Sequence, residues 1–203
     1  RNARIGAAVK FGTFEQDNEP ANGPEPIDWI VIAVEDDRAL LLTRYGIDSR
    51  PYNERNTETV WENSGIRDWL NKDFFENSFT DEGKDMIEET TSVNDSNPDW
   101  KTNGGKETVD RVFLLSFSET KEYLANLNLQ QLKPTSYAKA RGVWISEEKY
   151  YVGNVSWWLR TPGSQNNLAM TIMHVGTAKT FGSAVDTTGE AVRPALWVRI
   201  SQE

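Results

Sequence analysis

Two apolar segments near the N-terminus constrain the fold more than any other feature of this sequence. Residues 29–34 and 39–43 are almost continuously hydrophobic, and the segment between them, Glu35-Asp36-Asp37-Arg38, has the acidic composition of a turn. A near-continuous apolar run is typical of a strand whose two faces are both buried. The pattern therefore predicts a β-hairpin in the centre of a sheet, and residues 9–11 and 27–33 are read as strands around a polar loop.

Helical periodicity begins after the hairpin. Apolar residues at 66, 69, 70 and 74 share one face of a helix that Ser64 would cap. Thr80 precedes a second helix, and we expect Met86 and Ile87 to face the core. Further on, residues 112–115 are predicted to form a buried strand, Ser116-x-x-Glu119 is a capping box, and residues 135–141 form a short helix that ends at Gly142.

Strand patterns return after residue 144. Strands are predicted at residues 155–160, 168–175, 178–181, 184–186 and 192–200. Pro194 is expected at the start of the last strand or at an edge, because proline cannot donate to a ladder. No repeat or low-complexity linker interrupts the chain, so residues 1–203 are predicted to form a single α+β domain.

Composition excludes several classes of function. The chain has 31 acidic and 22 basic residues and a formal charge of −9, which argues against binding nucleic acid or anionic lipid. It has no cysteine and a single histidine, His174, so Cys-ligated zinc, iron–sulfur clusters, thiolate nucleophiles and multi-histidine metal sites are ruled out. We expect no metal and no cofactor. No apolar run reaches the roughly 18–20 residues of a membrane span, and no membrane insertion of this segment is expected.

Four ordered motifs identify a resemblance. They are Trp61-x-x-Ser64-x-Ile66-Arg67-x-Trp69-Leu70-Asn71, Phe113-Leu114-Leu115-Ser116, Trp157-Trp158-Leu159-Arg160-Thr161-Pro162-Gly163 and Val192-Arg193-Pro194-Ala195-Leu196-Trp197. In this order they resemble a family of bacterial domains of unknown function found in surface and phage-associated proteins. Its closing segment is similar to the C-type-lectin fold of formylglycine-generating-enzyme type, which the variable proteins of diversity-generating retroelements also use.

The resemblance implies both a fold and a function. The expected fold is an α+β, loop-rich, C-type-lectin-like domain whose helices pack around a small, mostly antiparallel sheet. The expected function is non-catalytic ligand recognition on a bacterial or phage surface, with an unidentified protein or glycan as partner. Enzymes with this fold need an active-site cysteine pair or a three-histidine iron site, which this composition lacks. The chain is therefore predicted to be non-enzymatic.

The resemblance places the ligand-binding face at residues 164–186. This segment mixes adaptable polar side chains with apolar ones, as binding surfaces do. The predicted ligand-binding residues are Gln165, Asn166, Asn167, Thr171, Met173, His174, Thr177, Lys179 and Phe181. Half-exposed strands have a similar composition, so the segment could equally be ordinary surface.

Several alternatives stay open. The domain could be a structural or adhesive spacer, or a hydrolase using two converging carboxylates in a cleft. Asp95-x-Asn97-x-Asp99 has the spacing that opens a calcium loop, but Trp100 replaces the required glycine and Lys106 the closing glutamate, which favours a plain Asx-rich turn. Arg160 and Arg193 could bind an anion, although a structural ion pair is the favoured interpretation of both.

Overall fold

A computed structural model describes residues 3–126 and 128–200, and its strands form three sheets. The first sheet has the order β1-β2-β3-β11. Its strands are β1 (Ala8–Phe14), β2 (Glu25–Glu35), β3 (Arg38–Thr43) and β11 (Ala195–Arg199). The predicted hairpin is confirmed: β2 and β3 pair antiparallel from Trp29↔Thr43 to Glu35↔Arg38 and occupy the two central positions of this sheet.

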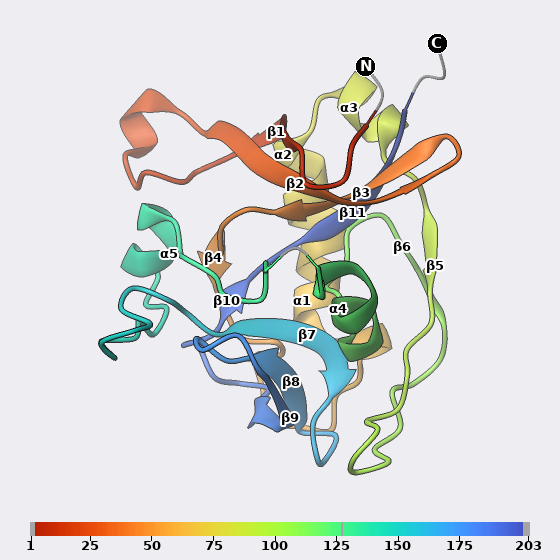
Figure 1. Cartoon of the computed structure of the whole chain (residues 1–203), viewed down its shortest axis with the longest axis vertical. Coiled ribbons are helices and arrows are strands. Elements are labelled where there is room, and N and C mark those ends of the chain that lie inside the picture. The colour runs from red at the N-terminus through yellow and green to blue at the C-terminus, as the bar shows by residue number, and fades with distance from the viewer. Residues whose placement is uncertain (1–2, 127, 201–203) are drawn as a thin grey trace.

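The second sheet lies below the first in Figure 1 and has the order β4-β10-β7-β8-β9. Its strands are β4 (Asp48–Ser49), β10 (Ala191–Val192), β7 (Trp157–Pro162), β8 (Leu168–Ile172) and β9 (Ala178–Ala184). β10 pairs parallel with β7, and the other pairs are antiparallel. Only Arg193 and Pro194 separate β10 from β11, so the chain leaves one sheet and enters the other within two residues. Pro194 directly precedes β11, as predicted.

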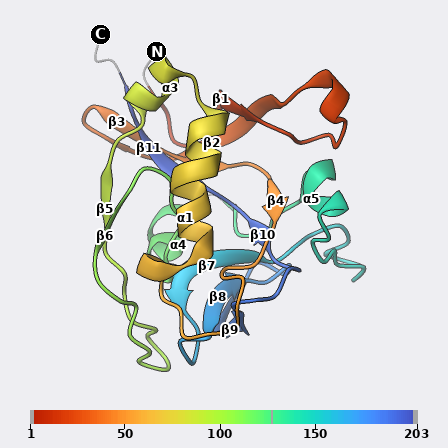
Figure 2. The same cartoon turned by 180° about the vertical axis from the view of Figure 1, so that it is seen from behind.

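A helical segment at residues 65–78 packs against the back of the two sheets and faces the viewer in Figure 2. It consists of α1 (Gly65–Trp69), a π-helical turn η3 (Leu70–Phe74) and α2 (Phe75–Ser78), and the short helix η2 (Trp61–Asn63) leads into it. Ser64 caps its start as predicted, since its hydroxyl accepts a hydrogen bond from Arg67 N at 3.3 Å. Leu70 and Phe74 are buried, so the predicted apolar face points into the core.

The remaining elements are short. They are η1 (Pro20–Asn22), α3 (Asp81–Met86), the two-stranded pair β5 (Thr90–Ser92) and β6 (Thr108–Asp110), α4 (Phe117–Leu124) and α5 (Ser136–Ala140). Thr80 caps α3 and the Ser116–Glu119 capping box opens α4, both as predicted.

Three local predictions were wrong. The strands predicted at residues 178–181 and 184–186 are one strand, β9, and residues 185–186 lie in a turn. Met86 is 44% exposed rather than directed into the core, because α3 ends there and only Ile87 turns inward. Residues 112–115 are buried but form no strand: only Phe113 makes a bridge, to Ala195. Burial of an apolar run shows that it is in the core, but a strand also needs a neighbour along its whole length.

Tryptophan side chains fill the centre of the molecule. Trp29 belongs to the first sheet, Trp157 and Trp158 to the second, and Trp61 to η2, and all four are fully buried. The adjacent pair Trp157 and Trp158 points to opposite faces of β7, and both faces are covered.

The predicted fold class was wrong. The molecule is β-rich, with 32% strand and 20% helix, and its antiparallel strands curl into a half-barrel with further sheets rather than forming one small sheet wrapped by helices. The C-type-lectin-like architecture is therefore not observed. The physical reason is that strand patterns predict where strands occur but not their partners, and the last strand pairs with β3 across most of the sequence.

Candidate functional site

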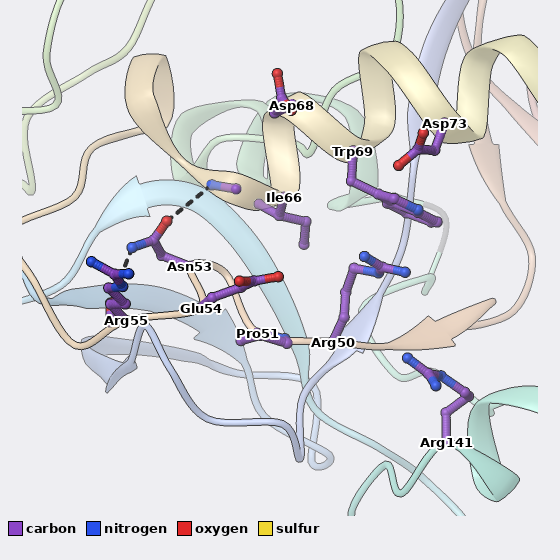
Figure 3. A pocket seen from close by; sticks show the side chains of 11 residues that line it. Arg50, Pro51, Asn53, Glu54, Arg55, Ile66, Asp68, Trp69, Asp73 and Arg141 are labelled. Atoms are coloured by element: carbon purple, nitrogen blue, oxygen red, sulfur yellow. Dashed lines mark hydrogen bonds between the residues drawn. The ribbon is translucent and has the colours of Figure 1, made fainter.

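A pocket of about 540 Å³ lies between β4, the loop that follows it and the helix at 65–78 (Figure 3). Its volume is within the roughly 300–1,000 Å³ range of small-molecule sites. The lining combines three arginines, three acids and one tryptophan: Arg50, Arg55, Arg141, Glu54, Asp68, Asp73 and Trp69. We call this the arginine pocket.

Two of the arginines share one buried acid. Asp48 in β4 is fully buried, and its two carboxylate oxygens accept hydrogen bonds from Arg50 Nε at 3.1 Å and from Arg141 Nε at 3.4 Å. The backbone N–H of Ser49 also donates to Asp48 Oδ1, at 2.7 Å. Asp48 thus holds two guanidiniums through their Nε atoms at one wall of the pocket.

Each of these guanidiniums has an unused edge. Within residues 3–126 and 128–200, no protein group accepts a hydrogen bond from the Nη atoms of Arg50 or Arg141. Arg141 points toward Arg50 in Figure 3. The paired Nη groups of a guanidinium match the two oxygens of a carboxylate, and charge-assisted bonds of this kind are the strong ones.

Trp69 holds Arg50 in place. The Arg50 guanidinium carbon lies 3.9 Å from the centre of the Trp69 ring, a cation–π stack. Trp69 in turn packs against Phe14 and Phe74, with ring centres 6.2 Å and 5.5 Å away. The π-helical turn begins directly after Trp69, and such turns occur often at functional sites. Arg50 is therefore oriented before any ligand arrives.

The helix α5 positions Arg141, the residue that follows its last turn, at the pocket. Thr135 caps α5, and its backbone N–H donates to Gly46 O at 2.9 Å, just before β4. A Cβ atom at Gly46 would lie 2.8 Å from the Ala191 side chain, so only glycine allows this close approach. Gly142 adopts φ +94° and ends the helix, as its position in the sequence predicted.

The acids lie at the rim of the pocket. Asp68 forms an ion pair with Lys72 at 2.6 Å, whereas Glu54 and Asp73 have no ion-pair partner in the described part of the chain. The Glu54 carboxylate points toward Arg50 in Figure 3. Asn53 fixes the loop, since its Oδ1 accepts from Gly65 N at 3.1 Å and its Nδ2 donates to Arg55 O at 3.0 Å. The site thus offers donors for an anion at its base and acceptors around it.

The predicted ligand-binding residues are not brought together at one pocket. Thr171 is 1% exposed, because its side chain is covered within β8. Gln165, Asn166 and Asn167 lie in the β7–β8 loop, where Asn167 Nδ2 donates to Asn56 Oδ1 at 3.1 Å. Met173 and Thr177 close the β8–β9 turn through a backbone hydrogen bond of 2.8 Å.

His174 lies in an aromatic cluster in that turn. Its ring centre is 5.1 Å from that of Trp144 and 6.1 Å from that of Tyr151, and its Nε2 lies 2.8 Å from Glu148 Oε1. Trp144 and Tyr150 are exposed beside it. Ser156 Oγ accepts from the backbone N–H of His174 at 3.1 Å, but in the described part of the chain no hydroxyl hydrogen-bonds to the His174 ring, so the ring lacks the nucleophile that a catalytic base would activate.

Phe181 and Lys179 occupy the edge strand β9. Phe181 is 51% exposed and packs edge-to-face on Trp100, with ring centres 5.8 Å apart. Lys179 Nζ donates to Ser183 Oγ at 3.4 Å, and Ser183 donates to Glu190 at 2.8 Å. Burial raises the pKa of Glu190 above its ordinary value, a shift that Ser183 and Lys179 partly offset. These contacts form a surface and not a concave site.

The segment at 95–99 is an Asx turn. Asn97 is fully buried: its Nδ2 donates to Pro162 O at 2.9 Å and to Thr180 O at 2.8 Å, while its Oδ1 accepts from the backbone N–H groups of Asp99 and Trp100. All hydrogen-bonding groups of its side-chain amide are therefore used by the protein.

A separate group of carboxylates consists of Glu15, Asp17 and Glu25, whose oxygens lie within 4.8 Å of one another. These oxygens accept hydrogen bonds from backbone N–H groups of the loop, so we assign no metal to this group.

A family model describes most of this chain. The model for a domain of unknown function, DUF6273, matches residues 36–200. The chain belongs to the DUF6273 family. The match begins at the turn of the N-terminal hairpin and includes every residue of the arginine pocket, whereas β1 and β2 precede it. Comparison with curated proteins found no significant match, and neither did comparison with solved structures.

The arginine pocket of this DUF6273 domain was missed by sequence reasoning. Trp69 was read only as part of a helix face, and Arg50 and Arg141 were not singled out. They lie 91 positions apart in the sequence and meet only through Asp48. No sequence spacing links two residues so far apart, so a single sequence does not reveal that both contact the same buried acid.

Proposed function

We propose that this DUF6273 domain is a non-catalytic recognition module whose ligand presents a carboxylate to Arg50 and Arg141. The observation that supports this most directly is the pair of guanidiniums that a single buried carboxylate, Asp48, holds by their Nε atoms. Their Nη groups remain available for a ligand. Display on a bacterial or phage surface, which the sequence motifs imply, is part of the same proposal.

The surroundings of the arginines favour an acidic sugar residue. A ligand of high negative charge would be repelled by Glu54, Asp68 and Asp73 at the rim. A single carboxylate avoids most of that repulsion, and sugar hydroxyls can donate to the same acids. Uronic acids combine both features in one ring. A free amino acid or a peptide C-terminus offers a carboxylate without such hydroxyls, and we treat it as the competing outcome.

The pocket also bears on the two rival functions. A spacer domain has no need of prearranged guanidiniums over a buried acid, whose assembly costs desolvation free energy. A carboxylate hydrolase would need a converging pair of acids, so Glu54→Gln together with Asp73→Asn would abolish hydrolysis if that rival were correct.

Binding of glucuronate to the purified domain tests the proposal. We expect saturable binding by isothermal titration calorimetry and little or no binding of glucose, which has the same ring without the carboxylate. Arg141→Gln removes one charge-assisted contact, each worth roughly 1.5–3 kcal/mol, so affinity should fall by about tenfold or more. Lys139→Gln is the matched control, because Lys139 is exposed on the same helix and makes no ion pair with a described residue.

Three outcomes would contradict the proposal. Equal binding of glucose and glucuronate would show that the carboxylate is not recognised. Equal loss of affinity in Lys139→Gln and Arg141→Gln would show a nonspecific charge effect. Tighter binding of free amino acids than of uronates would assign the pocket to the competing ligand class.

A further inference from the structure

Two arginines in the described part of this molecule are almost completely buried, and they differ in whether an acid pairs with them. Arg160 is 2% exposed and forms a bidentate ion pair with Glu119, with Nη1 at 2.5 Å from Oε2 and Nη2 at 2.8 Å from Oε1. Arg193 is 1% exposed, and no acid lies within ion-pair distance of it in the part of the chain that the structure describes. The ion pair predicted from the sequence is therefore confirmed for Arg160 and is wrong for Arg193.

The partners of Arg193 are all neutral. Its Nε donates to Thr43 O at 3.0 Å, its Nη1 donates to Leu129 O at 2.5 Å, and its guanidinium carbon lies 4.8 Å from the Trp157 ring centre. Among described residues, no group accepts from Nη2. Burial lowers the pKa of Arg193 to about 9, which reflects the lost hydration of a charge that no carboxylate offsets. Leaving a charge uncompensated in the interior is costly, so a counter-charge from elsewhere would be strongly favourable.

A cavity of about 500 Å³ opens beside this guanidinium. It lies between the start of β1, β2, the segment after β3 and the segment that precedes α5. Two further cations, Arg44 and Lys133, line it together with Tyr45 and Gln131, and its lining contains no acid. A cavity lined by one sign of charge concentrates ions of the opposite sign, and this one is positive in a chain whose formal charge is −9.

We propose that this cavity is a second binding site, which takes the phosphate group of a phosphomonoester with Arg193 as its buried contact. Arg193 supplies the uncompensated charge at the cavity wall, and Arg44 supplies a second guanidinium from the surface. Lys133 contributes charge while its Nζ donates to Val152 O at 2.5 Å. A dianion suits this cavity because no lining carboxylate repels it, in contrast to the arginine pocket with its three rim acids. The volume exceeds what inorganic phosphate alone would fill, which favours an ester with an organic part.

Thermal unfolding at constant ionic strength tests this proposal without a natural ligand. Replacing chloride with inorganic phosphate or phenyl phosphate should raise the Tm of the wild-type domain saturably, by about 3 °C at ten times Kd. Phenyl phosphate should act at lower concentration than inorganic phosphate. Arg44→Gln should weaken phenyl phosphate binding by about fivefold, the scale of one charge near the surface. Lys106→Gln, an exposed charge on the β5–β6 connection, should leave it unchanged.

Arg193→Met removes the buried charge at similar size and should abolish the phosphate effect on Tm. If this variant does not fold, Arg44→Gln and Lys133→Gln decide the question, since both side chains are exposed. Equal Tm in phosphate and chloride would overturn the proposal, as would a phosphate effect whose concentration dependence is unchanged in both surface variants. Arg141→Gln should leave the phosphate effect on Tm intact. The experiment therefore tests the phosphate site independently of the proposal for the arginine pocket.

Discussion

At the scale of single residues, the buried charge of Arg160 is stabilised by an ion pair and by several hydrogen bonds. Arg160 is surrounded by acceptors: besides Glu119, it donates to Asn94 Oδ1, Leu114 O and Val93 O. Glu119 has two tasks, because its Oε2 also accepts from Ser116 N at 2.8 Å in the capping box of α4. One carboxylate thus neutralises a buried cation and starts a helix, which ties β7 to α4.

Glu119→Gln separates these two tasks. Glutamine still completes a capping box, so the helix start is kept while the charge opposite Arg160 is lost. We expect the free energy of unfolding to fall by about 2 kcal/mol or more, measured by urea denaturation, because Arg160 is left buried and uncompensated. Glu35→Gln is the control: its pair with Arg38 at 2.6 Å is surface-exposed, and its loss should cost about 0.2–1 kcal/mol. Equal effects of the two substitutions would refute this account of Arg160.

At the scale of elements, the contact between β4 and the segment before α5 builds the arginine pocket. Gly46 bridges Pro134, its N–H donates to Lys133 O at 3.0 Å, and its missing side chain leaves room for Ala191 and Leu132. We expect Gly46→Ala to lower the free energy of unfolding by about 1–3 kcal/mol through overpacking, measured by urea denaturation. If the glycine positions Arg141 as described, the same variant should weaken glucuronate binding. Gly189→Ala serves as the comparison, since a Cβ there would meet Trp144 at 3.5 Å, an ordinary van der Waals contact.

At the scale of the whole molecule, the chain between β10 and β11 joins the two large sheets. Arg193 lies at this crossing and contacts both sheets, through Thr43 O at the end of β3 and the Trp157 ring in β7. The buried apolar side chains of both sheets belong to one core. Because neither sheet keeps its buried face without the other, we expect them to unfold together.

Urea denaturation followed by two probes tests this cooperativity. Tryptophan fluorescence reports on Trp29 in the first sheet and on Trp157 and Trp158 in the second, while far-UV circular dichroism reports on the backbone of both. The two probes should give coincident transitions with a single midpoint. Two resolved transitions in either signal would contradict cooperative unfolding of the sheets.

Local patterns in the sequence predicted the local structure well. The hairpin of β2 and β3, the Ser64, Thr80 and Ser116 caps and the stop at Gly142 all follow from side chains within a few residues of one another. Interactions of that range depend on backbone geometry that neighbours impose, so a single sequence is enough to infer them. The same holds for the exclusion of cysteine and multi-histidine chemistry, which needs only a count.

Only the tertiary structure decided which strands pair and which charges meet. The pairing of β11 with β3, the contact of Arg141 with Asp48, and the ion pair of Arg160 with Glu119 each join residues 40 or more positions apart. Such contacts depend on where whole elements pack and on the dielectric surroundings that packing creates, and neither is encoded in the spacing of residues along the chain.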